Sequence, residues 1–264
     1  MRATVLVRPK HGILDPQGQA VESSLRHLGF EVGEARVGRL IDIDVPTDDR
    51  DAQLALERLG ASAPRVWHTE DELPRETAAV VLPGGFSFGD YLRCGAIARF
   101  SPIVPAIESF AARGGLVLGI CNGFQILTEA GLLPGALRPN ESLSFVCRDV
   151  PLRIERTDTP FTSRCADGQE LTIPVKHGDG CWFADDELLV HLESTGQVLL
   201  RYAAGANPNG AIADVAGVAN ADGNVFGLMP HPEHAVDAVL GSTDGALILG
   251  SLVDAARLSL AAAV

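Results

Sequence analysis

The sequence predicts an α/β fold in which helices flank a doubly wound, mostly parallel sheet, with a short β-α-β segment at the N-terminus. Continuous apolar runs predict the sheet, because strands covered on both faces carry no polar side. These runs are residues 78–82, Leu116–Ile120 and 225–229. Helical patterns alternate with them, at about residues 102–113, 122–130 and 243–258. Such alternation is typical of doubly wound sheets, which bind ligands at the carboxyl ends of their strands.

Length and composition narrow the class of protein. The 264 residues suit one α/β domain with a small appendage, and 46% apolar against 21% charged residues excludes wholesale disorder. A formal net charge of -13 disfavours binding to nucleic-acid phosphates. No stretch approaches the roughly 20 apolar residues that span a bilayer. The N-terminus also lacks the apolar segment of a signal peptide, so we expect a cytoplasmic protein.

The chain changes character near residues 46–50, and this change predicts two parts, residues 1–46 and residues 47–264. The second part begins with a helical pattern over residues 48–59 and continues into the strands and helices given above. Its middle, about residues 145–202, is more irregular and rich in strand patterns.

The first part has the pattern of a strand, a helix and a second strand. Residues 2–8 predict the first strand. Asp15 followed by Pro16 predicts the helix start, because aspartate caps free N–H groups and proline suits the first helical position. Gly29 predicts the helix end. The second strand is expected over residues 32–45, which end in a strict alternation of apolar and acidic residues, as in a strand with one wet face.

Cys121 is the candidate nucleophile. It follows an apolar strand, precedes a helix and lies between Gly119 and Gly123, a pattern that places a nucleophile on a tight strand-to-helix turn. The helix N-terminus favours the thiolate, and the N–H of Asn122 faces a developing oxyanion. The alternative is a buried structural cysteine. We assign that role to the four cysteines that lack this setting, and no pair of cysteines has zinc-ligand spacing. The four are Cys94, Cys147, Cys165 and Cys181.

His231 and Glu233 are the candidate base and its orienting partner. The strand 225–229 ends before Pro230, so His231 stands at a strand end, where ligands bind in α/β folds. Glu233 points to the same side in extended geometry and can accept the imidazole N–H. A surface loop is the alternative. A metal site with His234 lacks an evident third ligand, so no metal is predicted.

Gly84 and Gly85 follow the strand at 78–82 and predict a second oxyanion donor. The two glycines let the backbone turn its N–H groups towards a neighbouring strand end, and Gly85 is the expected donor. A phosphate-binding loop is disfavoured, since the Gly-Lys-Ser/Thr ending of a P-loop is absent. A simple tight turn is the other alternative.

Three stretches together resemble the class I glutamine amidotransferases: residues 83–95, 119–125 and 229–233. Within that family they are most similar to PurQ, the glutaminase subunits of phosphoribosylformylglycinamidine synthase. The resemblance extends from about Asp51 to the C-terminus. It includes five further stretches, at residues 67–70, 140–142, 145–148, 176–180 and 207–210.

The resemblance implies a Cys–His–Glu triad that forms a thioester with glutamine and releases ammonia. The ammonia would pass to a large PurL-type synthetase subunit, which uses the ATP and Mg²⁺, so no cofactor is expected in this chain. The candidate glutamine contacts are Gly84, Gly85, Asn122 and Gln125. Residues 177–180 either line the pocket or contact a partner.

Residues 1–46 resemble the start of PurS, a small bridging subunit of the same complex. The likeness lies in residues 8–10, 14–18 and 37–39, and it implies a PurS-type partner. A PurS chain would continue with another helix and strand, and a PurQ chain would open with its own apolar strand. Either residues 41–45 supply that missing strand, which would bury two aspartates at several kcal/mol unless they are paired, or the sheet is incomplete.

Two other functions stay open on the residues alone. The same fold and nucleophile occur in peptidases and γ-glutamyl hydrolases, although the His-x-Glu spacing and the PurQ-like stretches disfavour them. A non-catalytic scaffold of the complex is the second alternative, if the altered N-terminus disrupts the sheet.

Overall fold

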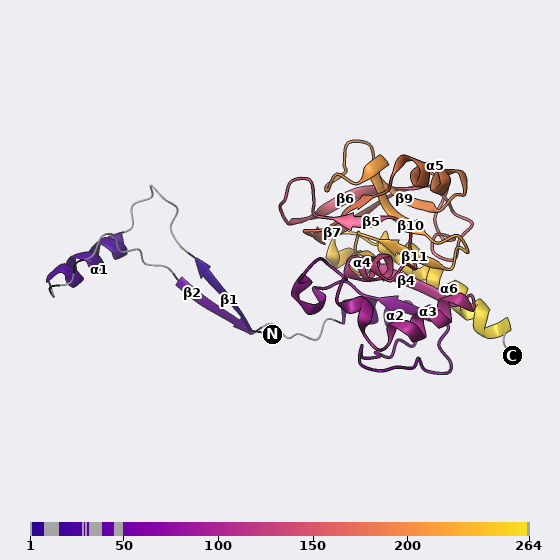
Figure 1. Cartoon of the computed structure of the whole chain (residues 1–264), viewed down its shortest axis with the longest axis horizontal. Helices are drawn as coiled ribbons and strands as arrows, with labels where there is room; N and C mark the ends of the chain where they lie inside the picture. Colours follow the sequence, from indigo (N-terminus) through magenta and orange to yellow (C-terminus); the bar gives the residue numbers. More distant parts are fainter. Residues whose placement is uncertain are drawn as a thin grey trace. The chain divides into compact units, whose positions relative to one another are not determined.

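The computed structural model describes residues 2–7, 16–27, 29, 31, 39–44 and 50–262. The chain divides into two compact units, Met1–Asp49 and Arg50–Val264 (Figure 1). In the described part, no helix is both long and apolar enough to cross a membrane.

The first unit contains a two-stranded antiparallel sheet and one helix. β1 (Arg2–Val7) pairs with β2 (Arg39–Asp44), and α1 (Pro16–His27) lies between them in sequence. This bears out the predicted strand and helix. The predicted second strand is described from residue 39 to residue 44, and the predicted N-cap Asp15 lies outside the described residues.

The hypothesis that residues 41–45 supply a strand of the main sheet is wrong. β2 pairs with β1, with Ile43 opposite Ala3 and Ile41 opposite Val5. The seven-stranded sheet of the second unit has β3 (Ala79–Leu82) as an edge strand, and β2 is not among its strands. The alternation of apolar and acidic residues at 41–44 also disfavours a strand covered on both faces, because such a strand would bury carboxylates.

The second unit is built on a mixed sheet of seven strands. In spatial order they are β3, β4 (Leu116–Ile120), β11 (Val225–Leu228), β10 (Val215–Ala219), β9 (Val198–Tyr202), β6 (Val146–Ile154) and β7 (Glu170–His177). β3, β4 and β11 pair in parallel, and the other neighbours pair antiparallel. Five strands therefore point one way, opposed by β10 and β6. The predicted α/β fold with a mostly parallel sheet is confirmed.

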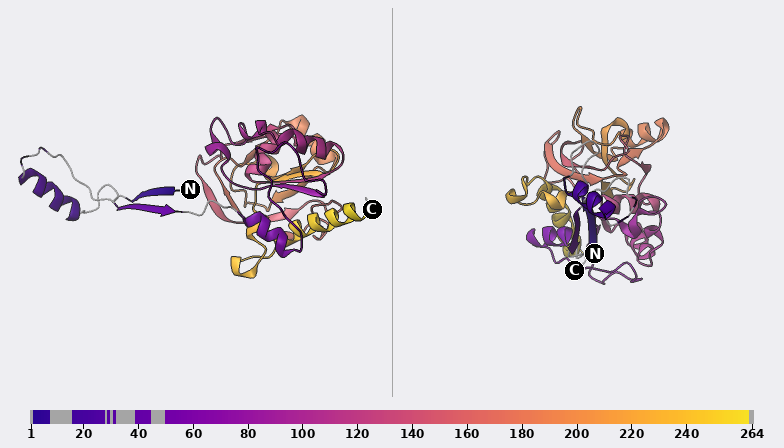
Figure 2. Two further views of the ribbon diagram at one scale, coloured as in Figure 1. Left: turned by 90° about the horizontal axis from the view of Figure 1, so that it is seen from below. Right: turned by 90° about the vertical axis from the view of Figure 1, so that its left-hand side faces the viewer.

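Helices cover both faces of this sheet. They are α2 (Asp51–Arg58), α3 (Val104–Ala112), α4 (Asn122–Glu129), α5 (Asp186–Ser194) and α6 (Gly245–Ala262). Figure 2 (left) shows α3 and α4 on one side of the strands and α2 and α6 on the other. Every residue of β4, β10 and β11 is buried between these layers, as the continuous apolar runs predicted for β4 and β11.

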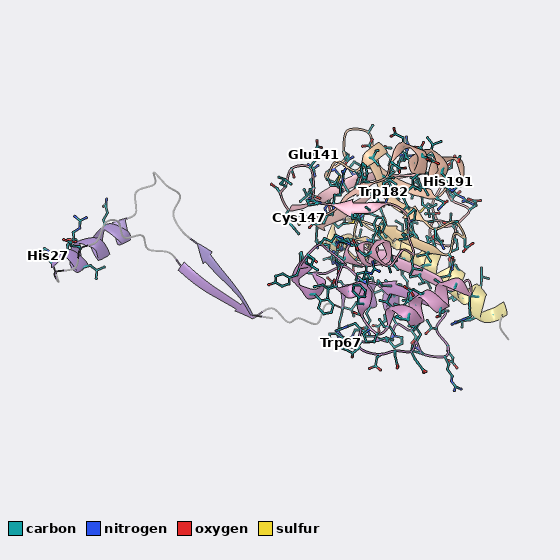
Figure 3. The ribbon with its side chains drawn as sticks, viewed as in Figure 1. His27, Trp67, Glu141, Cys147, Trp182 and His191 are labelled. Carbon is teal, nitrogen blue, oxygen red and sulfur yellow. The ribbon has the colours of Figure 1, made fainter. Side chains whose placement is uncertain are left out.

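The strand-rich middle of the chain also holds α5, which the sequence did not predict. Asp185 caps this helix by accepting a hydrogen bond from the N–H of Leu188 at 2.8 Å. A second small sheet pairs β5 (Ala136–Arg138) with β8 (Cys181–Phe183). Trp182 is fully buried there, and its indole N–H donates to the carbonyl of Pro134 at 3.1 Å (Figure 3).

Five short 3-10 turns complete the second unit. They are η1 (Ser87–Asp90), η2 (Ala98–Phe100), η3 (Ile212–Asp214), η4 (Pro232–His234) and η5 (Ala238–Leu240).

Two glycines allow α4 to approach the β3–β4 edge closely. A Cβ on Gly123 would lie 2.0 Å from the carbonyl oxygen of Leu82, and a Cβ on Gly119 would lie 2.8 Å from the backbone carbonyl of Gly123. Both distances are below any tolerable contact with a fixed neighbour. The turn between β4 and α4 can therefore form only with glycine at both positions.

Gly123→Ala should destabilise the second unit by about 2 kcal/mol, because the added methyl group meets a strand backbone that cannot move aside. Urea unfolding followed by tryptophan fluorescence measures this unit alone, since both tryptophans, Trp67 and Trp182, lie in it. Gly178→Ala is the control, because its methyl group would lie 4.0 Å from the Phe145 ring. Equal stability of the two variants would contradict the close-packing argument.

Candidate active site

Cys121 occupies the turn between β4 and α4 in a strained backbone conformation. Its φ is 48° and its ψ is -102°, a region that residues with a side chain rarely adopt. The Cys121 N–H donates to the carbonyl of Leu228 at 2.8 Å, and its own carbonyl accepts from the N–H of Gln125 at 3.1 Å. Neighbouring elements thus hold the strain and aim the side chain at the carboxyl ends of β4 and β11.

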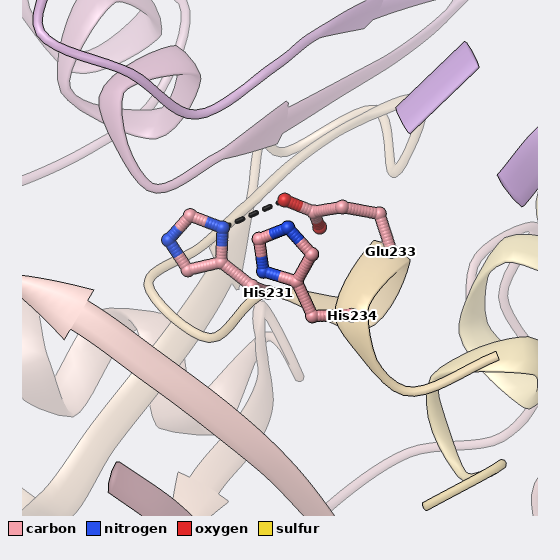
Figure 4. Close-up of side chains that lie close together, drawn as sticks. All are labelled: His231, Glu233 and His234. Carbon is pink, nitrogen blue, oxygen red and sulfur yellow. Dashed lines mark hydrogen bonds and ion pairs between the residues drawn. The ribbon is translucent and has the colours of Figure 1, made fainter. Parts of the chain in front are cut away.

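His231 and Glu233 form a buried pair next to that turn. Nδ1 of His231 lies 2.6 Å from Oε1 of Glu233 (Figure 4), and each residue is 5% exposed. The His231 N–H donates to the carbonyl of Pro174 at 2.8 Å, which fixes the backbone of the histidine on β7. Among the described residues, Nε2 of His231 and Oε2 of Glu233 have no hydrogen-bond partner. Nε2 is therefore the nitrogen left to exchange a proton with a nucleophile or substrate.

The electrostatic setting keeps His231 protonated. Burial by itself lowers the pKa of His231, but Cys121 and the hydrogen-bonded Glu233 outweigh burial and raise this pKa to about 10. The Sγ of Cys121 lies 3.7 Å from the carbonyl oxygen of Lys176. At neutral pH the site holds an imidazolium beside the sulfur.

Two other buried cysteines, Cys94 and Cys165, are held as thiols. Burial, followed by the charges of Asp90 and Asp179, raises the pKa of Cys94, whose Sγ lies 3.3 Å from Oδ2 of Asp179. Burial raises the pKa of Cys165 to about 11. A thiol without access to its anion is a poor nucleophile. This agrees with assigning the nucleophile to Cys121.

Gly84 lies against the ring of His231, and Gly85 follows it in the loop after β3. A Cβ on Gly84 would lie 2.6 Å from Cε1 of His231, so only glycine lets the loop pack on the imidazole ring. Gly85 has a φ of 142°. In the part of the chain that the structure describes, the N–H groups of Gly85 and Asn122 donate to no protein group. Both are free to bind an oxyanion, and their use as donors remains a prediction.

The side chains of Asn122 and Gln125 brace the loops around the turn. Asn122 accepts a hydrogen bond from the N–H of Ser87 at 3.3 Å and donates to Oε1 of Gln125 at 2.8 Å. Gln125 in turn donates to the carbonyl of Asp179 at 2.6 Å. Both side chains are buried. The chain of bonds ties the loop after β3 to residues 178–180, and the role of these side chains as glutamine contacts stays a prediction.

A buried polar network that the sequence did not interpret supports residues 177–180. Oδ1 of Asn140 accepts from the N–H of Gly180 at 3.0 Å and from Nδ1 of His177 at 3.1 Å. Nδ2 of Asn209 donates to the carbonyl of Gly180 at 2.8 Å and to the hydroxyl of Tyr202 at 3.0 Å. Burial, with the charge of His231 second, lowers the pKa of His177 to about 4, so this ring is neutral. The only sequence signal was the family likeness of these stretches.

His231, Glu233 and His234 are also the one group of described residues whose ligand atoms could meet at a metal, all lying within 4.8 Å of one another. The geometry disfavours a cation. Nδ1 of His234 lies 2.9 Å from the Lys176 ammonium, and Nδ1 of His231 is bonded to Glu233. A metal would have to displace a positive charge and break the buried pair. Glu233 is the third ligand that the sequence argument did not count, and the absence of a metal stays a prediction.

Comparisons with known proteins agree with these features. Residues 47–245 match the family model described as a CobB/CobQ-like glutamine amidotransferase domain. Residues 2–62 match the PurS model, described as phosphoribosylformylglycinamidine (FGAM) synthase. The two matches overlap over residues 47–62, which include α2, so the boundary between residues 46 and 47 stays a prediction.

Several relatives match this chain over nearly the whole of their own length. Phosphoribosylformylglycinamidine synthase subunit PurQ of Rubrobacter xylanophilus is 55% identical over 209 residues, 79% of this chain and 94% of that protein. PurQ of Thermus thermophilus is 54% identical over 215 residues, with the same coverage. The structure of PurLQS from Thermotoga maritima matches with a TM-score of 0.71 and 45% identity, covering 78% of this chain and 92% of that one.

Glu233→Gln should lower the pKa of His231 by more than about one unit, because the carboxylate that raises it is removed. The His231 imidazolium would then lose its proton well below pH 10. NMR titration of ¹⁵N-histidine-labelled chain measures this pKa, with the His231 signals identified by their loss in His231→Gln. Glu187→Gln, exposed on α5, should leave the midpoint in place. An unshifted midpoint in Glu233→Gln would show that Glu233 does not set the charge on His231.

Asn140→Ala should destabilise the second unit by about 3 kcal/mol, since it leaves buried groups of His177 and Gly180 without partners. Urea unfolding followed by tryptophan fluorescence measures the change. Ser142→Ala, exposed in the same turn, should stay within about 0.5 kcal/mol of the unsubstituted chain. A matching small effect for Asn140→Ala would refute the bracing role of the network.

Proposed function

Because this chain belongs to the glutamine amidotransferase family, with PurQ subunits among its relatives, we propose that it hydrolyses glutamine through Cys121, His231 and Glu233. The observation that carries the proposal is the buried His231–Glu233 pair, placed at the end of β11 beside a cysteine in a strained strand-to-helix turn. A nucleophile, an acid–base group and an orienting carboxylate are the parts that acyl transfer to a thiol requires.

In the first step, the Cys121 sulfur attacks the side-chain amide carbon of glutamine. The carbonyl oxygen becomes an oxyanion, for which the free N–H groups of Asn122 and Gly85 are the donors at hand. His231, cationic at neutral pH, gives its Nε2 proton to the departing nitrogen. Ammonia leaves and a thioester remains on Cys121.

In the second step, the now neutral His231 takes a proton from water, and the hydroxide attacks the thioester. Collapse of the second oxyanion releases glutamate and restores the sulfur anion beside the imidazolium. Glu233 holds the ring through Nδ1 in both steps and stabilises its charged form. Since Glu233 is buried, its charge is little screened by solvent and acts strongly on the ring.

We further propose that the ammonia passes to a PurL-type synthetase, which uses ATP and Mg²⁺ to form phosphoribosylformylglycinamidine, in a complex that also contains PurS-type subunits. The Thermotoga maritima relative was solved as PurLQS. The loop after β3 supports a protein partner. It exposes Phe86 (63%), Tyr91 (74%) and Leu92 (89%), and the Phe86 ring lies 6.2 Å from that of the exposed Phe145. Apolar surface gathered in this way is typical of interaction sites.

Two other functions make different predictions. A γ-glutamyl hydrolase would cleave γ-glutamyl peptides faster than glutamine. A non-catalytic scaffold would bind the synthetase without reacting with a glutamine analogue. The intact arrangement of His231 and Glu233 beside the turn at Cys121 favours catalysis, because it forms in a seven-stranded sheet that does not include β2.

A chloroketone analogue of glutamine should add once to the full chain, and Cys121→Ala should abolish the addition, because the analogue delivers its electrophile only where glutamine binds. Intact mass measures the adduct. Cys147→Ala is the matched control, since Cys147 is an exposed thiol on β6 (Figure 3) that unselective alkylation would reach first. Labelling that survives in Cys121→Ala and disappears in Cys147→Ala would overturn the assignment.

A further inference from the structure

His234 is held between two charged side chains next to the catalytic pair. Its Nδ1 lies 2.9 Å from Nζ of Lys176, and its Nε2 lies 2.8 Å from Oδ2 of Asp51. The His234 ring is stacked on the His231 ring, with centroids 5.2 Å apart and planes inclined by 10° (Figure 4). Neither Lys176 nor Asp51 has a role in the steps proposed above.

The partners determine where the proton of His234 sits. A lysine ammonium can only donate, so Nδ1 of His234 accepts its hydrogen bond. The proton is then on Nε2, where it is donated to the carboxylate of Asp51. Both ring nitrogens are thus engaged, and the plane of the ring is set from its two sides.

Lys176 links this ring to the nucleophile. Its backbone carbonyl oxygen lies 3.7 Å from Sγ of Cys121, while its side chain reaches His234. Two residues earlier on β7, the carbonyl of Pro174 accepts the hydrogen bond from the His231 N–H. The end of β7 therefore contacts Cys121, His231 and His234 together.

We propose that His234, held by Lys176 and Asp51, is a positioning residue that fixes the plane of the catalytic His231 imidazole. Glu233 bonds His231 at one atom, Nδ1, which leaves rotation about that bond to be restrained by packing. The parallel face of His234 supplies that restraint on one side, and the backbone at Gly84, where an added Cβ would lie 2.6 Å from Cε1 of His231, supplies another. The inference rests on the proposed function of Cys121 and His231.

Simple packing would not require this arrangement. An apolar ring could fill the same space without ordering a lysine and an aspartate around it, and holding long side chains costs conformational entropy. The side chain of His234 is 21% exposed and that of Asp51 is 57% exposed, so burial does not force these polar groups to find partners. The two hydrogen bonds therefore act to fix the orientation of the His234 ring.

Saturation kinetics of Cys121 alkylation by the chloroketone analogue of glutamine tests the proposal on the full chain. His234→Phe keeps a flat ring and loses both hydrogen bonds. We expect the limiting rate, kinact, to fall at least about tenfold and the half-saturating concentration, KI, to stay within about twofold, since orientation affects the reacting geometry more than binding. His234→Gln, which can accept from Lys176 and donate to Asp51, should recover part of kinact.

Asp51→Asn gives a second measurement in case His234→Phe fails to fold. Asp51 is on the surface of α2, so its substitution should leave folding intact. It should lower kinact with little change in KI or in unfolding temperature. His191→Phe is the matched control, since His191 is an exposed histidine on another element, α5 (Figure 3). Its kinact should be that of the unsubstituted chain.

The outcomes separate the two proposals. If the unsubstituted chain is alkylated at Cys121 and both His234→Phe and Asp51→Asn keep its kinact, the positioning role is wrong and the proposed function stands. A rise in KI at constant kinact would likewise exclude positioning and assign His234 to binding. If the unsubstituted chain is not alkylated at all, the proposed function fails and the positioning role fails with it.

Discussion

The close approach of α4 to the edge formed by β3 and β4 is the constraint on which the site depends. Gly119 and Gly123 bring the helix so near to Leu82 that the chain must turn sharply at Cys121, which adopts a φ of 48°. Packing of the whole sheet holds that strain, because the amide of Cys121 is bonded across to β11. The same strand continues to His231, so one strand pairing, β4 with β11, sets the spacing between nucleophile and base.

Buried polar side chains then give the surrounding loops a single arrangement. Asn140 and Asn209 satisfy the backbone of residues 178–180, and Gln125 bonds the same segment from α4. A buried amide without a hydrogen-bond partner is destabilising. Each bond therefore disfavours loop conformations in which it would be broken. The charge on His231 has a related origin. Burial opposes it, and only the nearby Glu233 and Cys121 make the imidazolium the stable form.

In the N-terminal unit, the local sequence pattern predicted that β2 is a strand but did not predict which strand it pairs with. The alternating residues of β2 predicted a strand correctly, and the pairing with β1 rather than with β3 came from the three-dimensional arrangement. Strand propensity alone does not decide between pairing with β1 and pairing with β3.

By itself, the sequence determined the α/β class, the buried strands β4 and β11, the turn at Cys121 and the pairing of His231 with Glu233, because each depends on residues close together in the chain. Tertiary structure decided what depends on distant segments. It brought Lys176 and Asp51 to His234, Asn140 and Asn209 to His177, and the ring of His231 against Gly84. No local pattern encodes such contacts, since a side chain's partner across a sheet is set by strand order and register, which only the packed core selects.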